Sequence, residues 1–343
     1  MSETSGTPQA PASQGTYTTA PRSIKAREAS DYPLEEFIES RGFRPEIQGL
    51  RAFAVLLVVL YHVWVGKVSG GVDVFLFISA FLLSLSFMRK INEGKPLNLF
   101  SYWMHVFQRL LPVATVVIAG TTIASFFVLA PSRWSQTVTD ARSSLFYFQN
   151  WNLAFSSVDY YAQNASVKSP FQHFWSLSIQ GQIFIIWPLL FAAVAYVVHR
   201  FRGNLFTTAV FIFNTVFVAS LTFSIVETDT NQGFAYFDTR PRLWEFAIGT
   251  LLAMLTLKWK APEKARVVMG WVGIIGLVTC GAILPVERAF PGYLALWPVI
   301  SGALVIMAGR TNSRWGIDRL LVSAPLQNLG NISYALYLVH WPI

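Results

Sequence analysis

The stretch Gly49-Leu50-Arg51-Ala52-Phe53-Ala54-Val55-Leu56-Leu57-Val58-Val59-Leu60-Tyr61-His62-Val63-Trp64 decides the fold. It is apolar apart from Arg51 and His62. At about 100° per residue, the steps between those two residues make roughly three helical turns, so both side chains lie on one face, about 16 Å apart along the axis. If this helix spans a bilayer, Arg51 marks one interface and His62 lies at depth, where an ionisable side chain costs free energy and indicates function. The alternative for His62 is a core histidine bonded to a neighbouring helix.

The composition predicts an all-α polytopic membrane protein. Hydrophobic residues make up 53% of the 343-residue chain and charged residues only 13%, which is too little charge for a soluble domain of this length. Apolar stretches long enough to cross a bilayer recur along the chain, and they lack the alternation of a membrane β-barrel. We expect about nine transmembrane helices, the last incomplete, at 50–66, 72–88, 110–130, 174–198, 205–226, 242–257, 268–285 and 291–308, with a start at 332.

The net charge of +8 is explained by topology rather than by nucleic-acid binding. With the N-terminus inside, nineteen of the 26 Lys and Arg residues fall on the cytosolic side, as the positive-inside rule requires. Residues 1–44 are rich in Ser, Thr, Pro and Ala at their start and predict a disordered cytosolic tail. The predicted location is therefore a cell membrane, which the chain crosses several times with the lipid bilayer as a partner.

Two stretches are expected outside the membrane. One is a basic, aromatic inner loop at 89–108, and the other is an outer loop at 131–174 rich in Trp, Tyr, Asn and Ser. The outer aromatics fit either an interfacial belt or a sugar-binding surface. The final apolar segment, from Asn331 to Ile343, is too short to cross the hydrocarbon core, which predicts a truncated chain. The single cysteine, Cys280, excludes a cysteine metal site, and no metal is expected.

Polar motifs recur in a specific order along these segments. They are Arg51-x10-His62, Gly70-Gly71-Val72-Asp73-Val74-Phe75, Arg109-Leu110-Leu111-Pro112, His173-Phe174-Trp175-Ser176-Leu177-Ser178, Arg242-Leu243-Trp244-Glu245 and Ser333-Tyr334-Ala335-Leu336-Tyr337-Leu338-Val339-His340-Trp341-Pro342. The order and spacing resemble the acyltransferase 3 family of integral membrane O-acyltransferases. The resemblance spans about residues 45–343, as an acyltransferase 3-like transmembrane domain that is incomplete at its C-terminus.

The resemblance implies an enzyme that transfers an acyl group, usually acetyl, from cytosolic acyl-CoA to a hydroxyl on an extracytoplasmic acceptor. Acceptors in the family are mostly sugars of envelope polysaccharides or glycolipids. Acyl-CoA is a donor substrate here, and no permanently bound cofactor is expected. The family core has about ten spans, and some members add an external SGNH-type domain. A tenth span and any such domain would lie beyond this chain.

The residues supply the chemistry that acyl transfer to an alcohol requires, namely a base and charge stabilisation. His62 is the natural general base. Arg51 can hold a donor phosphate or pantetheine amide. Asp73 is expected to orient His62 or bind acceptor hydroxyls, with a helix cap as the alternative. The predicted donor-binding residues are Arg51, Arg109, His105 and Arg89, and the predicted acceptor-binding residues are His173, Trp175, Ser178, Gln180, Glu245 and His340.

Some of these residues have simpler explanations. His173 and Trp175 also fit interfacial anchors, and Glu245 also fits an ion pair with Arg242 on one helix face. Two positions depart from the family pattern. Val106 replaces one arginine of an Arg-x-x-Arg pair, which would weaken phosphate binding unless His105, Arg89 or Lys90 substitute. Gln180 stands where an acidic residue is common, and an amide cannot accept a proton.

Two other functions fit the same sequence. A lipid or glycolipid transporter also needs intramembrane polar residues, although no repeat symmetry of the transporter type is visible. A catalytically degenerate membrane scaffold is suggested by Val106, Gln180 and the short final segment. Passage of substrate without acyl transfer would favour the first, and failure to bind acetyl-CoA would favour the second.

Overall fold

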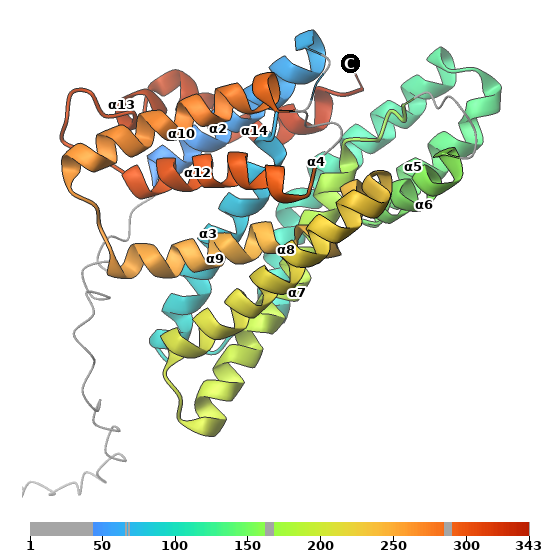
Figure 1. The fold of residues 1–343 in the computed structure, drawn as a ribbon. Coiled ribbons are helices and arrows are strands. Elements are labelled where there is room, and N and C mark those ends of the chain that lie inside the picture. The colour runs from blue at the N-terminus through green and yellow to red at the C-terminus, as the bar shows by residue number, and fades with distance from the viewer. Residues whose placement is uncertain (1–43, 66, 68, 162–167, 285–289, 343) are drawn as a thin grey trace, which may run out of the picture.

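The computed structural model of the chain is a bundle of helices (Figure 1), and it describes residues 44–65, 67, 69–161, 168–284 and 290–342. No strand occurs in this part of the chain, so the all-α class is confirmed. The predicted tail lies outside the described residues except for Arg44. The helices are α2 (Pro45–Leu60), α3 (Gly71–Asn92), α4 (Leu99–Val128), α5 (Trp134–Leu145), α6 (Gln149–Tyr161), α7 (Phe174–Phe201), α8 (Leu205–Phe237), α9 (Leu243–Lys258), α10 (Glu263–Ile283), α12 (Leu296–Ala308), α13 (Asp318–Leu321) and α14 (Ala324–Val339).

Six helices are long and apolar enough to cross a membrane, namely α2 with its extension to Val65, α3, α4, α7, α8 and α10. The other three expected spans coincide with α9, the segment Tyr293–Ala308 and α14, which are shorter. A helix of 16 residues is about 24 Å long, less than the roughly 30 Å hydrocarbon core. The count of nine and the cytosolic N-terminus therefore stay predictions.

Several expected boundaries were wrong because helical hydrogen bonding continues past the apolar residues. Helix α4 begins at Leu99 rather than 110, since the Asn98 side chain accepts from the Ser101 amide and caps it. The expected inner loop at 89–108 thus shrinks to residues 93–98. Helix α14 likewise begins before 332. The expected outer loop contains α5 and α6.

Helices α2 and α14 run parallel, and polar contacts fix their register. At the end where α2 begins, here called the proximal end, Gln327 Nε2 donates to the Pro45 carbonyl over 2.8 Å. One turn further, Gln48 Nε2 donates to Asn331 Oδ1 over 3.1 Å. Gly330 faces Gln48 so closely that an added Cβ would lie 2.8 Å from Gln48 Cγ. The two helices therefore reach the opposite, distal end of the bundle side by side.

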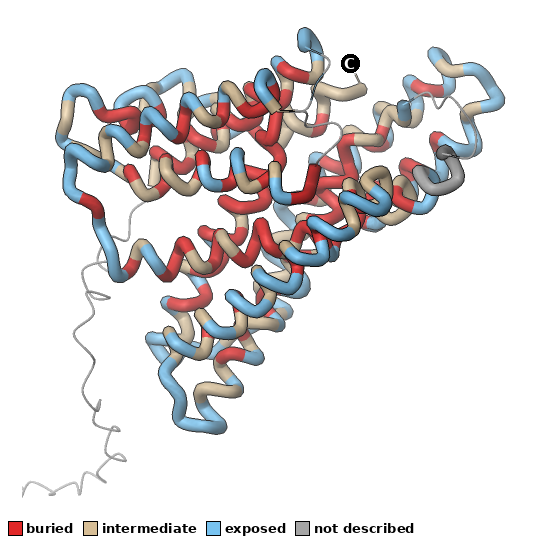
Figure 2. Tube along the Cα trace, viewed as in Figure 1, coloured by how far each residue is buried: buried red, intermediate tan, exposed pale blue. Residues whose placement is uncertain are grey.

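Helix α3 occupies the centre of the bundle. In the most apolar stretch of α3, 72% of the residues are buried, compared with 17% in the corresponding stretch of α4. Figure 2 shows buried residues along most of α3 and α9. These two helices touch at Gly249, where an added Cβ would lie 2.5 Å from the Phe77 carbonyl oxygen. The start of α9 is thereby held next to the start of α3, at the distal end.

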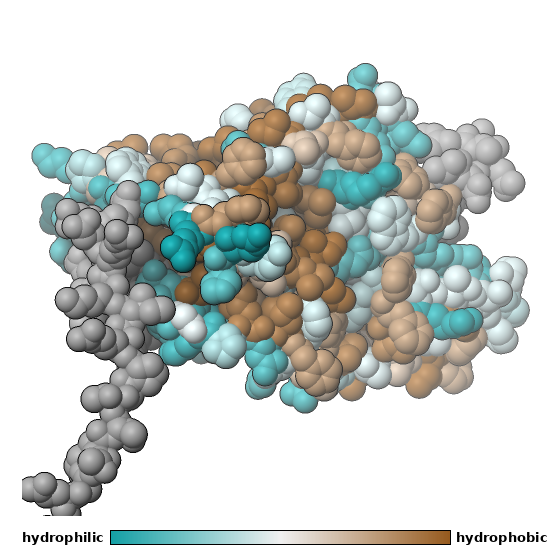
Figure 3. Space-filling view, turned by 90° about the horizontal axis from the view of Figure 1, so that it is seen from below, coloured by the Kyte–Doolittle hydropathy of each residue, from teal (hydrophilic) through white to brown (hydrophobic). Residues whose placement is uncertain are grey.

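The outer faces of the bundle are apolar. Phe127 is 86% exposed and Phe211 is 72% exposed, and Figure 3 shows brown, hydrophobic side chains across much of the face seen from below. Large exposed apolar areas indicate contact with lipid or another protein. Together with the six long apolar helices, they identify a multi-pass membrane protein.

Candidate functional site

Three histidines meet at the distal end. His62 Nδ1 lies 3.3 Å from His340 Nε2. Their rings stack with centroids 5.4 Å apart and an interplanar angle of 18°. The His173 ring centroid lies 5.6 Å from that of His340. The structure thus brings together one predicted base and two predicted acceptor residues from three different elements.

A turn of π-helix carries His62. Helix α2 changes into this turn, η1, at Tyr61–Val65, and π-turns inside helices occur frequently at functional sites. The Tyr61 hydroxyl donates to the Val278 carbonyl over 2.8 Å, which fastens the turn to α10. His62 is half-buried, while the following residues to Val65 are exposed. His62 therefore lies near the distal end of its helix, and its depth in the membrane stays a prediction.

Backbone carbonyls hold the other two imidazoles. His340 Nδ1 donates to the Tyr337 carbonyl over 2.6 Å, and His173 Nε2 donates to the Leu338 carbonyl over 2.9 Å. Burial lowers the pKa of His173 well below its usual range, and the neighbouring His340 lowers that pKa further. Burial likewise lowers the pKa of His340. Both rings are therefore neutral near pH 7. Over the described ranges, no group of three or more His, Cys, Asp and Glu is arranged to hold a metal ion.

A buried charged cluster lies at the starts of α3 and α9. Arg242 Nη1 donates to Asp73 Oδ1 over 2.9 Å and to Glu245 Oε1 over 3.1 Å. All three residues are at most 2% exposed. A third hydrogen bond fixes the guanidinium, because its Nε donates to the Tyr236 carbonyl. The polar partner of Asp73 is thus Arg242 rather than His62, and the predicted roles of Asp73 and Glu245 at the reaction stay predictions.

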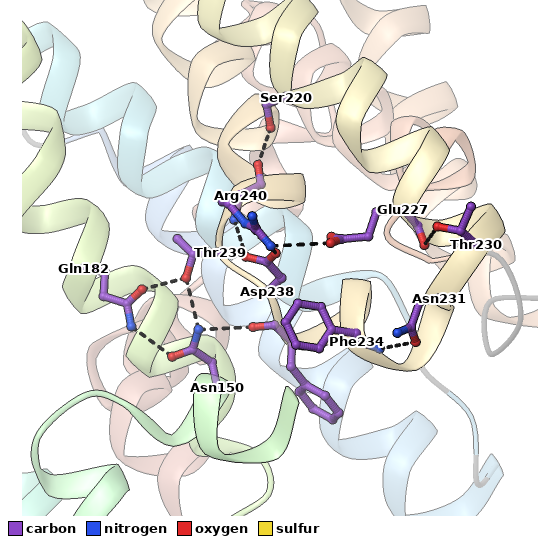
Figure 4. A network of polar contacts seen from close by, with 11 residues as sticks. Asn150, Gln182, Ser220, Glu227, Thr230, Asn231, Phe234, Asp238, Thr239 and Arg240 are labelled. Carbon is purple, nitrogen blue, oxygen red and sulfur yellow. Dashed lines mark hydrogen bonds and ion pairs between the residues drawn. The ribbon is translucent and has the colours of Figure 1, made fainter. Parts of the chain in front are cut away.

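The segment that precedes Arg242 is held by a polar network (Figure 4). Thr239 Oγ1 donates to Gln182 Oε1 over 2.6 Å, and Asn150 Nδ2 donates to Thr239 Oγ1 over 3.0 Å. Arg240 pairs with Asp238 over 2.6 Å. These contacts join α6, α7 and the end of α8, and they fix the turn from which Arg242 enters the bundle.

Near the proximal end, two arginines approach one another. The Arg51 and Arg109 guanidiniums are close enough for electrostatic repulsion. Neither belongs to an ion pair between described residues. The contact recorded for Arg51 is a 3.5 Å approach to Gln48 Oε1. Two neighbouring cations that form no ion pair with a described carboxylate favour an anionic ligand.

The other two predicted donor residues have protein partners. His105 lies one helical turn before Arg109 on α4 and donates from Nδ1 to the Ser101 carbonyl over 2.6 Å. Arg89 lies 3.9 Å from Glu93 at the end of α3. The structure therefore joins Arg51 with Arg109 but does not bring Arg89 to them.

Three predicted acceptor residues face the interior. The Trp175 ring lies under Arg242, with Cζ 4.5 Å from the ring centroid. Ser178 Oγ accepts from the Gln149 amide, and Glu245 belongs to the charged cluster. Gln180, half-buried, donates from Nε2 to Ser79 Oγ over 2.6 Å. Their roles toward an acceptor stay predictions.

Two site residues were missed from the sequence. Arg242 was considered only as a partner of Glu245, although it also binds Asp73. Tyr337 had no assigned role, yet its hydroxyl donates to the His173 carbonyl over 3.0 Å and lies 2.6 Å from Ser176 Oγ. Asp73 and Glu245 both lie in apolar segments and need a positive partner there, and this need would have indicated that Arg242 contacts both. The second belongs to the motif that begins at Ser333, but the motif did not indicate this contact.

Comparison with known proteins gives a consistent result. A family model described as an acyltransferase domain matches residues 44–343. The O-acetyltransferase OatA of Staphylococcus aureus is 28% identical over 326 residues, covering 92% of this chain and 53% of OatA. The putative membrane-bound transacylase BcsY of Komagataeibacter xylinus is 30% identical over 312 residues, covering 90% of this chain and 75% of BcsY.

The peptidoglycan O-acetyltransferase OatA of Listeria monocytogenes is 27% identical over 316 residues, covering 89% of this chain and 50% of that protein. The chain thus spans about half the length of its OatA relatives. No solved structure matches it significantly. The chain belongs to the acyltransferase 3 family, and the family's domain occupies residues 44–343.

Proposed function

We propose that this protein is a membrane O-acyltransferase that moves an acyl group, usually acetyl, from cytosolic acyl-CoA to a hydroxyl of a cell-envelope glycan or glycolipid. The observation that carries the proposal is the placement of Arg51 and His62 on one helix. Arg51 lies toward the proximal end beside a second unpaired arginine. His62 lies at the distal end with its Nδ1 next to a neutral imidazole.

Arg51 and Arg109 would bind the donor. The phosphates of the donor would supply the negative charge that balances these two neighbouring guanidiniums, and arginine binds phosphate oxygens in a bidentate manner. A donor held there would extend its pantetheine arm along α2 toward His62. With Val106 in place of a second α4 arginine, Arg51 contributes a larger share of the positive charge.

His62 would act as the general base. The acceptor hydroxyl gives its proton to the imidazole as its oxygen attacks the thioester carbonyl carbon. A carbon–oxygen bond forms and the carbon–sulfur bond breaks. The imidazolium then returns the proton to the departing thiolate, which leaves as the CoA thiol. The products are an ester and a free thiol, with His62 restored. A base of this kind contributes about 10²–10⁴ in rate.

The acceptor class is supported by the relatives. Two are named O-acetyltransferases, and one of these carries peptidoglycan in its name. The distal end, where His62, His173 and His340 meet, would face the envelope if the N-terminus is cytosolic. The aromatic segment with α5 and α6 lies at this same end (Figure 1) and would border the acceptor.

The test compares O-acetyl esters on the envelope glycans and glycolipids of strains with and without the full gene. Loss of one ester in the deletion strain identifies both reaction and acceptor. When the deletion strain receives the gene with His62→Ala, the ester should stay absent. When it receives the gene with His199→Ala, the ester should return, because His199 is exposed at the proximal end of α7. Membrane abundance of both variants must match the wild type. Full restoration by His62→Ala would refute the general base.

A further inference from the structure

The hydrogen bonds around His340 determine where its proton lies. A carbonyl oxygen can only accept, so His340 Nδ1 must carry the hydrogen that reaches the Tyr337 carbonyl. In a neutral imidazole the other nitrogen then carries a lone pair. His340 Nε2 is therefore an acceptor, and it faces His62 Nδ1 at 3.3 Å. A hydrogen bond between them requires the hydrogen on His62 Nδ1.

We propose that His340 is a positioning residue that fixes the tautomer of His62, so that His62 Nδ1 carries the hydrogen and His62 Nε2 presents the lone pair to the acceptor hydroxyl. This rests on the proposed function, in which His62 is the base. It gives His340 a role through His62 rather than through contact with the acceptor.

The pair is built to hold one orientation. His62 is on the π-turn after α2, and His340 follows the end of α14, which packs in parallel register with α2. The Trp341 ring meets the His62 ring edge-on, with centroids 5.3 Å apart. The stacked imidazole and the tryptophan edge together restrict rotation of the His62 ring.

The other charged and titratable groups near His62 do not substitute for His340. His173 Nε2 is already committed to the Leu338 carbonyl. Lys168, whose Nζ lies 5.5 Å above the Trp341 ring, acts on His62 only as a like charge. No carboxylate of the described residues forms a hydrogen bond or ion pair with His62. A neutral histidine thus occupies the place that a carboxylate takes in a Ser-His-Asp triad.

Two substitutions at His340 separate this role from packing. His340→Phe keeps a planar ring but offers no acceptor. His340→Gln offers a carbonyl oxygen near the position of Nε2. We expect kcat to fall at least about tenfold in the Phe variant, toward the 10²–10⁴ contributed by a general base, with the KM for acetyl-CoA within about twofold of wild type. The Gln variant should retain kcat within about fivefold. His199→Phe is the matched control and should match the wild type.

The direct readout is the ¹⁵N spectrum of histidine-labelled full-length protein in bilayers. The wild type and His340→Gln should show His62 protonated at Nδ1, with the signal assigned through His62→Gln. His340→Phe should shift His62 toward the Nε2-protonated form. Unchanged kcat and tautomer in a folded His340→Phe protein would overturn the proposal. Equal kcat losses in both variants with an unchanged tautomer would also overturn it, and would instead indicate acceptor contact.

The spectrum does not depend on turnover, so the two hypotheses fail separately. A wild type that shows no acyl transfer but has a His340-dependent tautomer refutes the proposed function and supports the pairing. An active enzyme whose His62 tautomer ignores His340 refutes only the pairing.

Discussion

Arg242 and Asp73, 169 positions apart in sequence, form an ion pair of 2.9 Å at the distal end of the bundle. Both side chains are buried, and Arg242 also pairs with Glu245 over 3.1 Å. The pair joins the starts of α3 and α9, which pack against one another along their length. One cation therefore contacts two buried carboxyl groups, and its loss would remove the cationic partner of both in the interior.

Replacing Arg242 should strongly destabilise the protein. Arg242→Met is expected to cost about 3–5 kcal/mol in unfolding free energy, because removing one partner leaves buried, uncompensated charge. Adding Asp73→Asn and Glu245→Gln should recover part of that loss. The measurement is thermal unfolding in detergent. Arg200→Gln is the matched control, since Arg200 is exposed at the end of α7 and belongs to no ion pair between described residues, and surface substitutions of this kind change stability by about 0.5 kcal/mol or less. Equal losses in both single variants would contradict the buried cluster.

The close approach of α3 and α9 makes Gly249 sensitive to substitution. An added Cβ would meet the Phe77 carbonyl at 2.5 Å, so Gly249→Ala should destabilise by about 1–3 kcal/mol through overpacking. Gly120→Ala in α4 is the control, because its Cβ would meet nothing within 4 Å. That substitution should stabilise slightly, by roughly 0.5–1 kcal/mol, as alanine favours helix interiors. The measurement is the shift in the unfolding midpoint relative to the wild type, which should be downward for Gly249→Ala and upward for Gly120→Ala. Shifts in the same direction would contradict this prediction.

Removing the positive charge near the proximal end should weaken donor binding. Arg51→Gln and Arg109→Gln are each expected to raise the KM for acetyl-CoA about 10- to 100-fold, since a hydrogen bond to a charged group contributes about 1.5–3 kcal/mol. Arg51→Lys should restore only part of the loss, because lysine cannot form the bidentate contact. Initial rates at varied donor concentration provide the measurement. Arg200→Gln, exposed at the proximal end of α7, should leave KM unchanged. A fall in kcat alone would contradict donor binding.

Introducing an acidic residue at position 180 should not be neutral. Gln180 donates to Ser79 Oγ, while the Ser79 hydroxyl donates to the Phe75 carbonyl. A glutamate there would place a carboxylate oxygen against Ser79 Oγ, so that two acceptors would face one another with no hydrogen between them. Gln180→Glu should therefore cost about 1–3 kcal/mol, and the loss should grow as pH rises and the new carboxyl ionises. Unfolding measured at pH 4 and pH 8 tests the sign, with Gln180→Met as the uncharged control. A pH-independent change would argue against this contact.

Much of this protein follows from the sequence alone. The apolar stretches predicted the helices because backbone groups in a hydrocarbon environment must be paired within the segment. The helical period placed Arg51 and His62 on one face, and the motif order indicated the family. Boundaries were less certain, as at Leu99, because capping and helix continuation depend on local hydrogen bonds rather than on hydropathy.

Only the tertiary structure decided which polar residues meet. His62 and His340 are 278 positions apart, and their contact depends on the register of α2 and α14 and on a π-turn with no sequence signal. Asp73 was expected to orient His62, bind acceptor hydroxyls or cap its helix; it pairs with Arg242, because the packing of α9 on α3 places the guanidinium beside it. The sequence determines which elements form and which residues are costly to bury. The packing of helices that are distant in sequence decides which partner each buried polar or charged residue contacts, and these contacts give the site its geometry.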